Sequence, residues 1–388
     1  MAGSANTRQP RAHDYHVEVF HSPLSLVQQL GSVKRTMLDQ NHSSLWKSSR
    51  KSRILTHEQV LVGRDAASGY HGIIAIHSTA LGPAVGGTRF WQYDSEEEAL
   101  TDALRLSQGM TYKNALPGLP LGGGKSIIIR NKAANREALL RAHGRFVDTL
   151  KGRYITAEDV GTSPADMEIV RLETRYVAGL LGGSGDPSPF TARGVFRAIQ
   201  ASSRFRWNSD DLSGVTVAIQ GCGHVGYNLA KFLHESGAKL IVTDVNRESV
   251  ARVVDEFAAK DVEPGEIYSV TADIFAPCAL GGVINDATIA ELKVQIVAGA
   301  ANNQLAEERH GAMLRERNIL YAPDYVANAG GVLNGCIELL GWEAEHALSK
   351  VDGIYDTMLS IFESAQAQGI TTNEAADRLA EDRLRRAV

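Results

Sequence analysis

The chain has 388 residues, 44% of them hydrophobic and 22% charged, with a formal net charge of −5 and three cysteines. This length suits two domains, the composition excludes a largely disordered chain, and the absence of a basic excess gives no reason to expect nucleic-acid binding. Scattered cysteines, no secretion signal and no apolar stretch of the ~18 residues that span a bilayer predict a cytoplasmic protein without membrane partners.

The first 54 residues differ in composition from the rest of the chain. They are rich in Ser, His, Gln and basic residues, and they end in the basic cluster Lys47–Arg53. The apolar spacing of Leu24–Leu30 is enough for one or two helical turns. We expect residues 1–54 to form a mobile extension or a loosely docked arm. A basic arm that touches RNA and a targeting segment are the alternatives.

Regular patterning begins at residue 55 and predicts a first α/β domain over residues 55–185. Two short β-branched runs surround a Gly-containing turn, as in a hairpin: Gln59–Val62 and Ile73–Ile76. Ser95 and Glu98 have the spacing of a capping box that opens an amphipathic helix. The same reasoning predicts a buried strand and two more helices, at Ser126–Ile129, Glu137–Leu150 and Met167–Leu181.

Strands and helices alternate beyond the linker candidate Gly182–Pro187. Such alternation predicts a parallel sheet wrapped by helices. The expected strands cover 215–219, 239–243, 274–276 and 294–298, and the expected helices cover 225–236, 246–259, 343–368 and a segment capped by Thr371. We therefore expect two α/β lobes, with the C-terminal helices of residues 348–388 packing back on the first domain.

The most specific motif is Gly221-Cys-Gly-His-Val-Gly226, which follows a predicted strand and opens a predicted helix. Its glycines permit a tight turn, the approach of a pyrophosphate to the backbone, and close helix packing. Asp244 lies 18 residues beyond Gly226, where it would bind the ribose hydroxyls and repel a 2′-phosphate. The motif predicts NAD rather than NADP, although Arg247 would favour NADP. A glycine-rich turn without a ligand is the alternative.

A second glycine-rich segment, Pro120–Ser126, superficially looks like a phosphate loop. The loop pattern needs glycine at position 119, where the chain has Leu119, and a helix must follow, whereas a strand is predicted. What remains is a pair of lysines, Lys113 and Lys125, 12 residues apart. Partial burial beside another cation would lower a lysine's pKa and let it act as a base. Solvated surface lysines are the alternative interpretation.

Two acids, Glu158 and Asp159, follow a predicted strand and precede a glycine. Acids at a strand end are candidates for proton transfer. The alternative is a structural cap for the helix that starts near Pro164.

Together these segments closely resemble the NAD-dependent amino-acid dehydrogenases, the family of glutamate, leucine, valine and phenylalanine dehydrogenases. The resemblance runs from about Glu58 to the C-terminus. It implies an α/β fold of two lobes with a cleft between them: a substrate and oligomerisation lobe, and a Rossmann NAD-binding lobe over residues 186–347. The motifs that carry it are Leu81–Arg89, Met110–Asn114, Pro120–Lys125, Ile155–Val160, Gly221–Gly226, Ala276–Gly282, Ala298–Asn303 and Asn328–Gly331.

The resemblance implies reversible oxidative deamination, in which an L-amino acid, water and NAD give a 2-oxo acid, ammonia and NADH. Lys113 then resembles the residue that pairs with the substrate α-carboxylate. Lys125 resembles the base that activates water and polarises the carbonyl, and Asp159 the proton shuttle to nitrogen. Gly86 and Gly87 would let the carboxylate approach backbone amides.

The resemblance also implies a set of cofactor-binding residues. One of them, Asn303, is implied to contact the substrate as well. The implied cofactor-binding residues are Thr191, Gly221, Gly223, His224, Val225, Gly226, Asp244, Val245, Cys278, Ala279 and Asn303.

Substrate choice follows from the residues implied to line the side-chain pocket, which are Val85, Met110, Ala157, Val332 and Gly335. Glutamate-specific members have a lysine where this chain has Val85, and a buried unpaired carboxylate is costly, so an apolar amino acid is expected. Ala157 and Val332 match the branched-chain pattern and favour leucine, valine or isoleucine. Gly335 departs from it and deepens the pocket, so phenylalanine or tryptophan is the alternative.

Two other classes of function remain. A catalytically silent NAD-binding regulator would be expected to lack Lys113, Lys125 or Asp159, and an amine dehydrogenase would have replaced Lys113; all three residues are present. The histidines show no metal-ligand spacing, so no metal is predicted. The resemblance implies a homo-oligomer, a dimer or an octamer.

Overall fold

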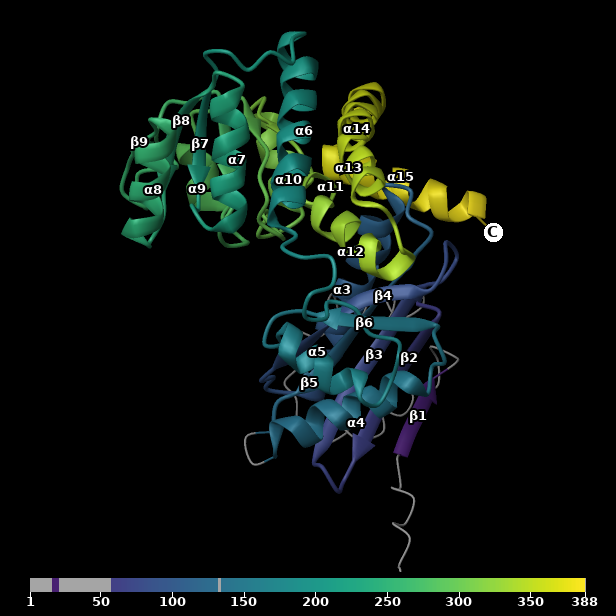
Figure 1. Ribbon diagram of the computed structural model, residues 1–388. Coiled ribbons are helices and arrows are strands. Elements are labelled where there is room, and N and C mark those ends of the chain that lie inside the picture. Colours follow the sequence, from purple (N-terminus) through teal and green to yellow (C-terminus); the bar gives the residue numbers. More distant parts are fainter. Residues whose placement is uncertain (1–15, 21–56, 132–133, 388) are drawn as a thin grey trace, which may run out of the picture. The chain divides into compact units, whose positions relative to one another are not determined.

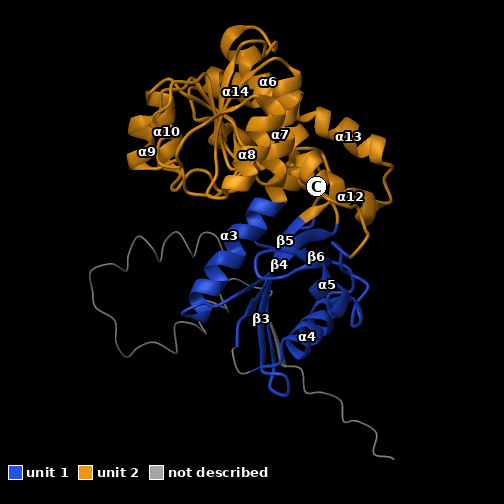
Figure 2. Cartoon of the chain, turned by 60° about the vertical axis from the view of Figure 1, so that its left-hand side comes forward, with its two compact units in different colours: residues 1–79, 83–110, 123–180 blue, residues 80–82, 111–122, 181–388 orange. Residues whose placement is uncertain are grey.

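The computed structural model describes residues 16–20, 57–131 and 134–387 (Figure 1). The helical turns expected at 24–30, the basic cluster and the mobility of the extension lie outside these residues. The chain divides into two compact units (Figure 2). Unit 1 contains the described residues up to Thr79, with Pro83–Met110 and Gly123–Leu180. Unit 2 contains Ala80–Gly82, Thr111–Gly122 and the chain from Leu181 onward.

Unit 1 is built on a mixed sheet. Among its described residues six strands pair in the order β1-β2-β3-β5-β4-β6. The predicted hairpin is confirmed, because β2 and β3 pair antiparallel. The elements are β1 (His16–Phe20), β2 (Gln59–Asp65), β3 (Tyr70–Ser78), β4 (Ala84–Trp91), α3 (Glu96–Ala115), β5 (Gly122–Ile129), α4 (Arg136–Asp148), β6 (Tyr154–Glu158) and α5 (Pro164–Arg171).

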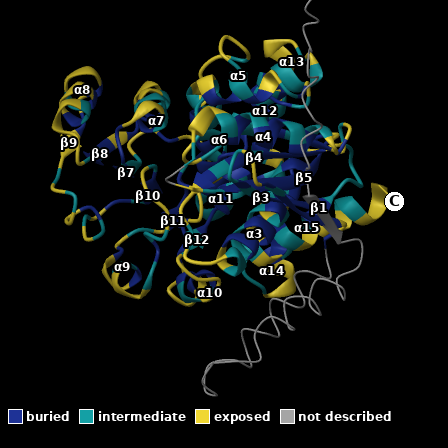
Figure 3. Cartoon of the chain, turned by 90° about the horizontal axis from the view of Figure 1, so that it is seen from below, coloured by how far each residue is buried: buried dark blue, intermediate teal, exposed yellow. Residues whose placement is uncertain are grey.

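Side-chain alternation along the strands gives this sheet two faces, and Figure 3 shows that most residues of its central strands are buried. In β3, Ile74 packs with Phe146 of α4 and Met167 of α5. Ile73, one residue earlier, packs on the other face with Leu104 of α3. The unit therefore has α4 and α5 on one face of the sheet and α3 on the other.

Two local predictions for unit 1 differ from the structure. His16–Phe20, inside the N-terminal extension, forms β1 and pairs antiparallel with β2. The helix expected over Met167–Leu181 ends at Arg171. Beyond it, Val177 forms a parallel bridge with Thr156 at the edge of the sheet, and the Ala178 N–H donates to the Thr156 carbonyl. Pairing with β6 thus satisfies backbone groups that a longer helix would have paired internally.

Unit 2 contains a parallel sheet. Up to Ala387, its strands pair in the order β12-β11-β10-β7-β8-β9, which is the Rossmann order. The Rossmann prediction is therefore confirmed. Its elements are α6 (Ser188–Trp207), β7 (Thr216–Gln220), α7 (His224–Glu235), β8 (Lys239–Thr243), α8 (Arg247–Phe257), β9 (Lys260–Asp261), β10 (Ile274–Pro277), α9 (Asp286–Glu291), β11 (Ile296–Val297), α10 (Arg309–Glu316), β12 (Leu320–Tyr321), α11 (Asp324–Ala327) and α12 (Gly330–Leu340).

Three helices complete the chain: α13 (Ala344–Asp352), α14 (Ile354–Gln368) and α15 (Thr372–Ala387). The single helix expected over 343–368 is divided at Gly353. These helices cluster with unit 2 rather than with the first domain. Within unit 2, α15 contacts the end of α3, because Arg383 donates to the carbonyls of Ala115 and Leu116. No described helix has the length and apolar character of a membrane span.

Candidate active site

Lys125 and Asp159 form a close ion pair in unit 1. The Lys125 Nζ lies 2.9 Å from Asp159 Oδ2, and the lysine side chain is 6% exposed. Lys125 lies in β5, and Asp159 directly follows β6. The sequence alternatives of a solvated Lys125 and of Asp159 as a helix cap are therefore wrong. The N-cap of α5 is Ser163, which forms a capping box with Asp166.

Two charged residues that the sequence analysis did not select continue this pair. Arg89 Nε donates to Asp159 Oδ2 at 3.1 Å, and Arg89 Nη1 donates to Asp102 Oδ2 at 2.7 Å. Tyr93 donates to the same Asp102 oxygen at 2.7 Å. An arginine inside an apolar strand was the available sequence signal. The result is a row of alternating charges that runs from β5 through β4 to α3.

The charge row perturbs the pKa values of its members. Burial lowers the pKa of Lys125, although Asp159 opposes this shift. Burial acts to raise the pKa of Asp159, but Lys125 and Arg89 outweigh it and hold that pKa below its usual range. Asp159 is thus kept ionised, while Lys125 is brought toward the range where an amine can accept a proton near neutral pH.

A buried polar network occupies the opposite face of the same strands. The Thr88 hydroxyl is hydrogen-bonded to Ser126 Oγ at 2.8 Å, to His143 Nε2 at 2.9 Å and to the Thr156 hydroxyl. Tyr70 is hydrogen-bonded to the other ring nitrogen of His143 at 2.9 Å. Burial lowers the pKa of His143 to about 3, so the ring is neutral. The network ties β4, β5 and β6 to α4 and fixes the strands that present Arg89 and Lys125.

Gly86 and Gly87 have a packing reason that the sequence analysis did not foresee. A Cβ on Gly86 would lie 1.8 Å from the Gly124 carbonyl oxygen of β5. A Cβ on Gly87 would lie 2.5 Å from the Glu158 carbonyl oxygen and 2.7 Å from the Asp159 Cβ. These glycines bring β4 close to its neighbours, and Gly87 leaves room for Asp159.

The other predicted substrate residues divide between the units. Val85 in β4 is buried, whereas Ala157 in β6 and Met110 in α3 are partly exposed. All three belong to unit 1. Val332 and Gly335 lie in unit 2, three residues apart on α12, and so share a helix face. A Cβ on Gly335 would meet no atom within 4 Å, so the missing side chain leaves open space there.

Lys113 lies in the last turn of α3 and clusters with unit 2, not with Lys125. Its charge acts on Asp324, a buried carboxyl whose pKa burial raises and Lys113 lowers. Asp324 also accepts the Gln304 N–H at 2.9 Å. The preceding Tyr112 donates to Glu381 of α15 at 3.1 Å. The end of α3 is thus held by α15, which fixes the segment that presents Lys113.

The glycine motif has the geometry of a dinucleotide loop. Gly221 has a φ of +103°, and its N–H donates to the Thr243 carbonyl at 2.8 Å. A Cβ on Gly226 would lie 1.9 Å from the Gly221 carbonyl oxygen, so Gly226 permits the close packing of α7. A Cβ on Gly223, by contrast, would meet nothing within 4 Å, so its backbone is open for an approaching group. The loop fits a pyrophosphate at the N-terminus of α7.

Asp244 is at the end of β8, beside this loop. Its Oδ2 accepts the Cys222 N–H at 2.7 Å, and its Oδ1 accepts the Asn246 N–H at 2.8 Å. These bonds orient the carboxylate and leave lone pairs for further donors. Arg247, the feature that favoured NADP, is paired with Glu263 at 2.5 Å.

The remaining predicted cofactor residues lie in loops after the strands of the parallel sheet or on α6 and α7. The Cys278 N–H donates to the Gln220 carbonyl at 2.7 Å, and Ala279 limits the space at Gly221. Asn303 has a positive φ of 53°, a conformation that asparagine tolerates better than most residues. The others are Thr191 in α6, His224 and Val225 at the start of α7, and the exposed Val245.

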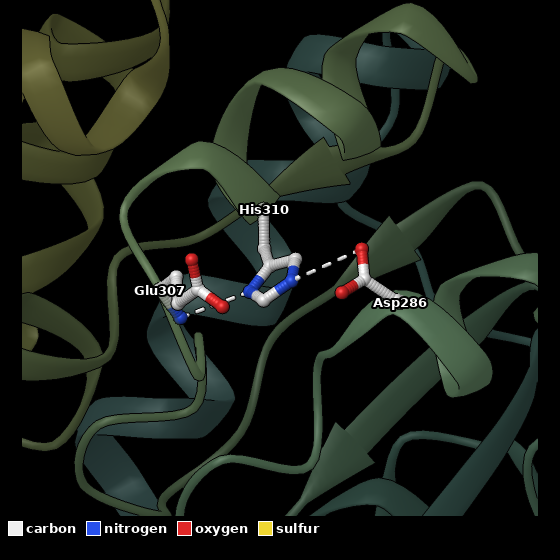
Figure 4. A group of neighbouring side chains, drawn as sticks. All are labelled: Asp286, Glu307 and His310. Carbon is white, nitrogen blue, oxygen red and sulfur yellow. Dashed lines mark hydrogen bonds and ion pairs between the residues drawn. The ribbon is translucent and has the colours of Figure 1, made fainter. Parts of the chain in front are cut away.

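Asp286, Glu307 and His310 in unit 2 each offer one atom that can bind a metal, and these atoms lie within 4.8 Å of one another (Figure 4). His310 Nδ1 accepts the Glu307 N–H at 2.9 Å, so the proton of the neutral ring is on Nε2, which faces Asp286 at 3.7 Å. Arg309 already pairs with Asp286 and Glu307, at 2.5 and 2.9 Å. The group is therefore an ion-pair cluster in which no histidine lone pair is directed at a cation.

A Rossmann unit and a buried lysine–aspartate pair define a two-domain dehydrogenase. Two family models match the chain: "Glu/Leu/Phe/Val dehydrogenase, dimerisation domain" over residues 54–176, and "Glutamate/Leucine/Phenylalanine/Valine dehydrogenase" over 182–246 and 242–388. The chain belongs to this family and is an amino-acid dehydrogenase, an oxidoreductase.

Individual relatives agree with this assignment. The chain is 57% identical to leucine dehydrogenase of Thermoactinomyces intermedius, with 84% of this chain and 91% of the relative covered. It is 52% identical to L-tryptophan dehydrogenase of Nostoc punctiforme, with 86% and 94% covered. The crystal structure of L-tryptophan dehydrogenase from Nostoc punctiforme superposes with a TM-score of 0.81 at 50% identity, covering 88% of this chain and 99% of that one.

Proposed function

We propose that the protein catalyses NAD-dependent, reversible oxidative deamination of an apolar L-amino acid of the leucine type. The observation that carries the proposal is the buried Lys125–Asp159 pair, 2.9 Å apart, in a chain that also has a Rossmann loop open at Gly223. An L-amino acid, water and NAD⁺ would give the 2-oxo acid, ammonium, NADH and a proton. The cofactor supplies the acceptor for the hydride that leaves Cα.

Each residue of the pair then has a distinct proton to move. Lys125 in its amine form takes a proton from the water that attacks the imine carbon. When the resulting carbinolamine collapses, its hydroxyl proton passes by way of Asp159 to the leaving nitrogen, and the ammonium form of Lys125 donates a hydrogen bond to the 2-oxo oxygen. Asp159 exchanges protons with the substrate nitrogen, which must be neutral when hydride leaves and protonated when ammonia leaves. Lys113 holds the α-carboxylate by charge. Burial lowers the pKa of Lys125, which supports its role as a base, and the ionised carboxylate of Asp159 is the form that can accept a proton.

The domain assignment is part of the proposal. Residues 55–185 supply Lys125, Asp159 and Val85 for the substrate, and residues 186–347 supply the cofactor loop. We also propose a cytoplasmic homo-oligomer. The matched family model is described as a dimerisation domain, and the three cysteines are free thiols, which suits a reducing compartment.

The amino acid is tested by initial rates with a panel of L-amino acids. Leucine, valine and isoleucine are expected to be oxidised, and glutamate to be inert because Val85 offers its carboxylate no partner. Preference for glutamate would contradict the pocket argument.

Gly335 keeps an aromatic substrate as the second candidate, since its missing side chain leaves space. Gly335→Val is therefore expected to lower kcat/KM for phenylalanine more than for leucine. Equal effects on the two substrates would place position 335 outside the side-chain pocket.

The choice of NAD depends on Arg247 as well as on Asp244. Glu263 pairs with the guanidinium of Arg247, which lies three residues after Asp244 and could attract a 2′-phosphate. Glu263→Gln is expected to raise kcat/KM with NADP by about two- to fivefold, a small effect because exposed ion pairs are worth little. Glu291→Gln, the same charge change on α9, is the control and is expected to leave the NADP-to-NAD ratio unchanged. An unchanged ratio in Glu263→Gln would show that Arg247 takes no part.

A further inference from the structure

Asp159 Oδ2 has two cationic partners. Lys125 Nζ lies 2.9 Å from it and Arg89 Nε 3.1 Å from it. Both members of the lysine–aspartate pair are largely withdrawn from water, with 6% and 23% of their side chains exposed. With lysine as its only partner, the carboxylate would lose its counter-charge whenever Lys125 lost its proton, which is costly in such surroundings. A guanidinium keeps its proton in proteins.

We propose that Arg89 is a positioning residue of the deamination site: it stabilises the carboxylate form of Asp159 and keeps that side chain in place while Lys125 alternates between its ammonium and amine forms. The inference rests on the proposed function, because that reaction requires Lys125 to change its charge. Arg89 acts through Asp159 and needs no contact of its own with the substrate.

The surroundings of Arg89 keep its guanidinium oriented. Nη1 donates to Asp102 Oδ2 at 2.7 Å, and Asp102 is held in turn by Tyr93 at 2.7 Å and by Arg105 at 3.1 Å. Because one edge of the guanidinium is bound by Asp102, Nε is directed at Asp159. A lysine at position 89 would keep the charge but could not make both contacts in this geometry.

The charged groups that face Lys125 come from three elements: Asp159 after β6, Arg89 from β4 and Asp102 from α3. Burial lowers the pKa of Lys125, both carboxylates raise it, and Arg89 lowers it. Loss of Arg89 therefore favours the ammonium form. Oxidative deamination requires Lys125 in its amine form. The acidic limb of the pH profile of kcat/KM must therefore move to higher pH when Arg89 is lost.

A guanidinium ion from solution can take the place of the Arg89 side chain in a variant that lacks it. Arg89 lines an open pocket of about 660 Å³ in unit 1, together with Trp91, Tyr93, Asp102 and Arg105. A guanidinium ion is small enough to enter a pocket of this volume. It could then occupy the space that truncation of Arg89 leaves between the two carboxylates.

The experiment compares Arg89→Ala, Arg89→Lys and a control, Arg141→Ala, in the full-length enzyme. Arg141 is another ion-paired arginine of unit 1, on α4. In Arg89→Ala the acidic limb of kcat/KM for L-leucine is expected to rise by about one pH unit or more. Guanidinium, at concentrations far below those that unfold the enzyme, is expected to restore both the rate of Arg89→Ala and the wild-type position of its acidic limb. Arg89→Lys is expected to keep the wild-type limb with a reduced kcat, and Arg141→Ala the wild-type profile.

A merely structural role would lower the rate at every pH, leave the limb in place and give no guanidinium rescue. That result would overturn the inference. If Arg89→Ala does not fold, Arg89→Lys provides the test. This variant keeps the positive charge, so a shift of one pH unit in the acidic limb of its kcat/KM profile would also contradict the inference.

A direct titration separates this inference from the proposed function. The [ε-¹³C]lysine NMR signal of Lys125, assigned by its loss in Lys125→Arg, reports the lysine pKa without any substrate. A wild-type enzyme inactive on every amino acid would refute the proposed function. An equal Lys125 pKa in wild type and in Arg89→Ala, the variant that removes the charge, would refute the inference alone.

Discussion

Lys125→Ala is expected to lower kcat for oxidative deamination by about 10²–10⁴-fold, the range that general acid–base groups contribute. The alanine removes the amine that activates water, and it leaves Asp159 paired with Arg89. Binding of NADH should persist, because the glycine loop belongs to unit 2 and Lys125 to unit 1. Steady-state rates and NADH fluorescence titration measure the two effects separately.

The control for this prediction is Lys151→Ala. Lys151 also belongs to unit 1 and also pairs with an aspartate, Asp148, but its side chain is 72% exposed. It should keep full activity. A Lys125→Ala enzyme with near wild-type turnover would show that another group moves the proton.

The second large effect concerns cofactor binding and uses two glycines of one loop. Gly226→Ala would place a Cβ 1.9 Å from the Gly221 carbonyl oxygen, so α7 must move away from the loop. Gly223→Ala would place its Cβ in open space and has an ordinary negative φ of −68°. We expect Gly226→Ala to lower the thermal stability of the protein and to abolish NADH binding.

Gly223→Ala is expected to melt at the wild-type temperature and still to bind NADH much more weakly, since the added methyl group lies where a pyrophosphate would approach the backbone. Thermal melting with and without NADH distinguishes the two variants. If Gly223→Ala bound NADH normally, the motif would be a glycine-rich turn without a ligand, the alternative considered from the sequence.

Local signals predicted much of the fold. Short apolar runs around a glycine-containing turn predicted the hairpin of β2 and β3. A glycine-rich turn between a strand and a helix predicted the Rossmann unit. The failures occurred where tertiary contacts outweigh local preference. Residues 172–181 have helical spacing, yet Val177 pairs with the edge of the sheet. The helix α6 was not predicted, although its buried residues Ala192, Val195 and Ile199 have helical spacing.

The site was predicted unevenly for a related reason. Lys125 and Asp159 were found because their motifs occur in the order that the family shows. Arg89 and Asp102 were missed, since Arg89 lies 70 residues from Asp159 and 13 from Asp102 along the chain, and the packing of the sheet and α3 brings the three together. Gly86 was assigned to substrate approach, which stays a prediction, and the carbonyl of Gly124 in the next strand gives a separate packing reason for its lack of a side chain.

The two faces of the central strands have different roles, and this constrains the number of residues in β5. Lys125 and Ser126 are adjacent, yet the lysine meets Asp159 while the serine meets Thr88 and, at 3.3 Å, His143. A single inserted or deleted residue in β5 would exchange an ammonium for a hydroxyl beside the reactive carboxylate. Homologues that differ freely in surface loops should therefore hardly ever differ in the number of residues within this strand, even where the residues themselves have changed.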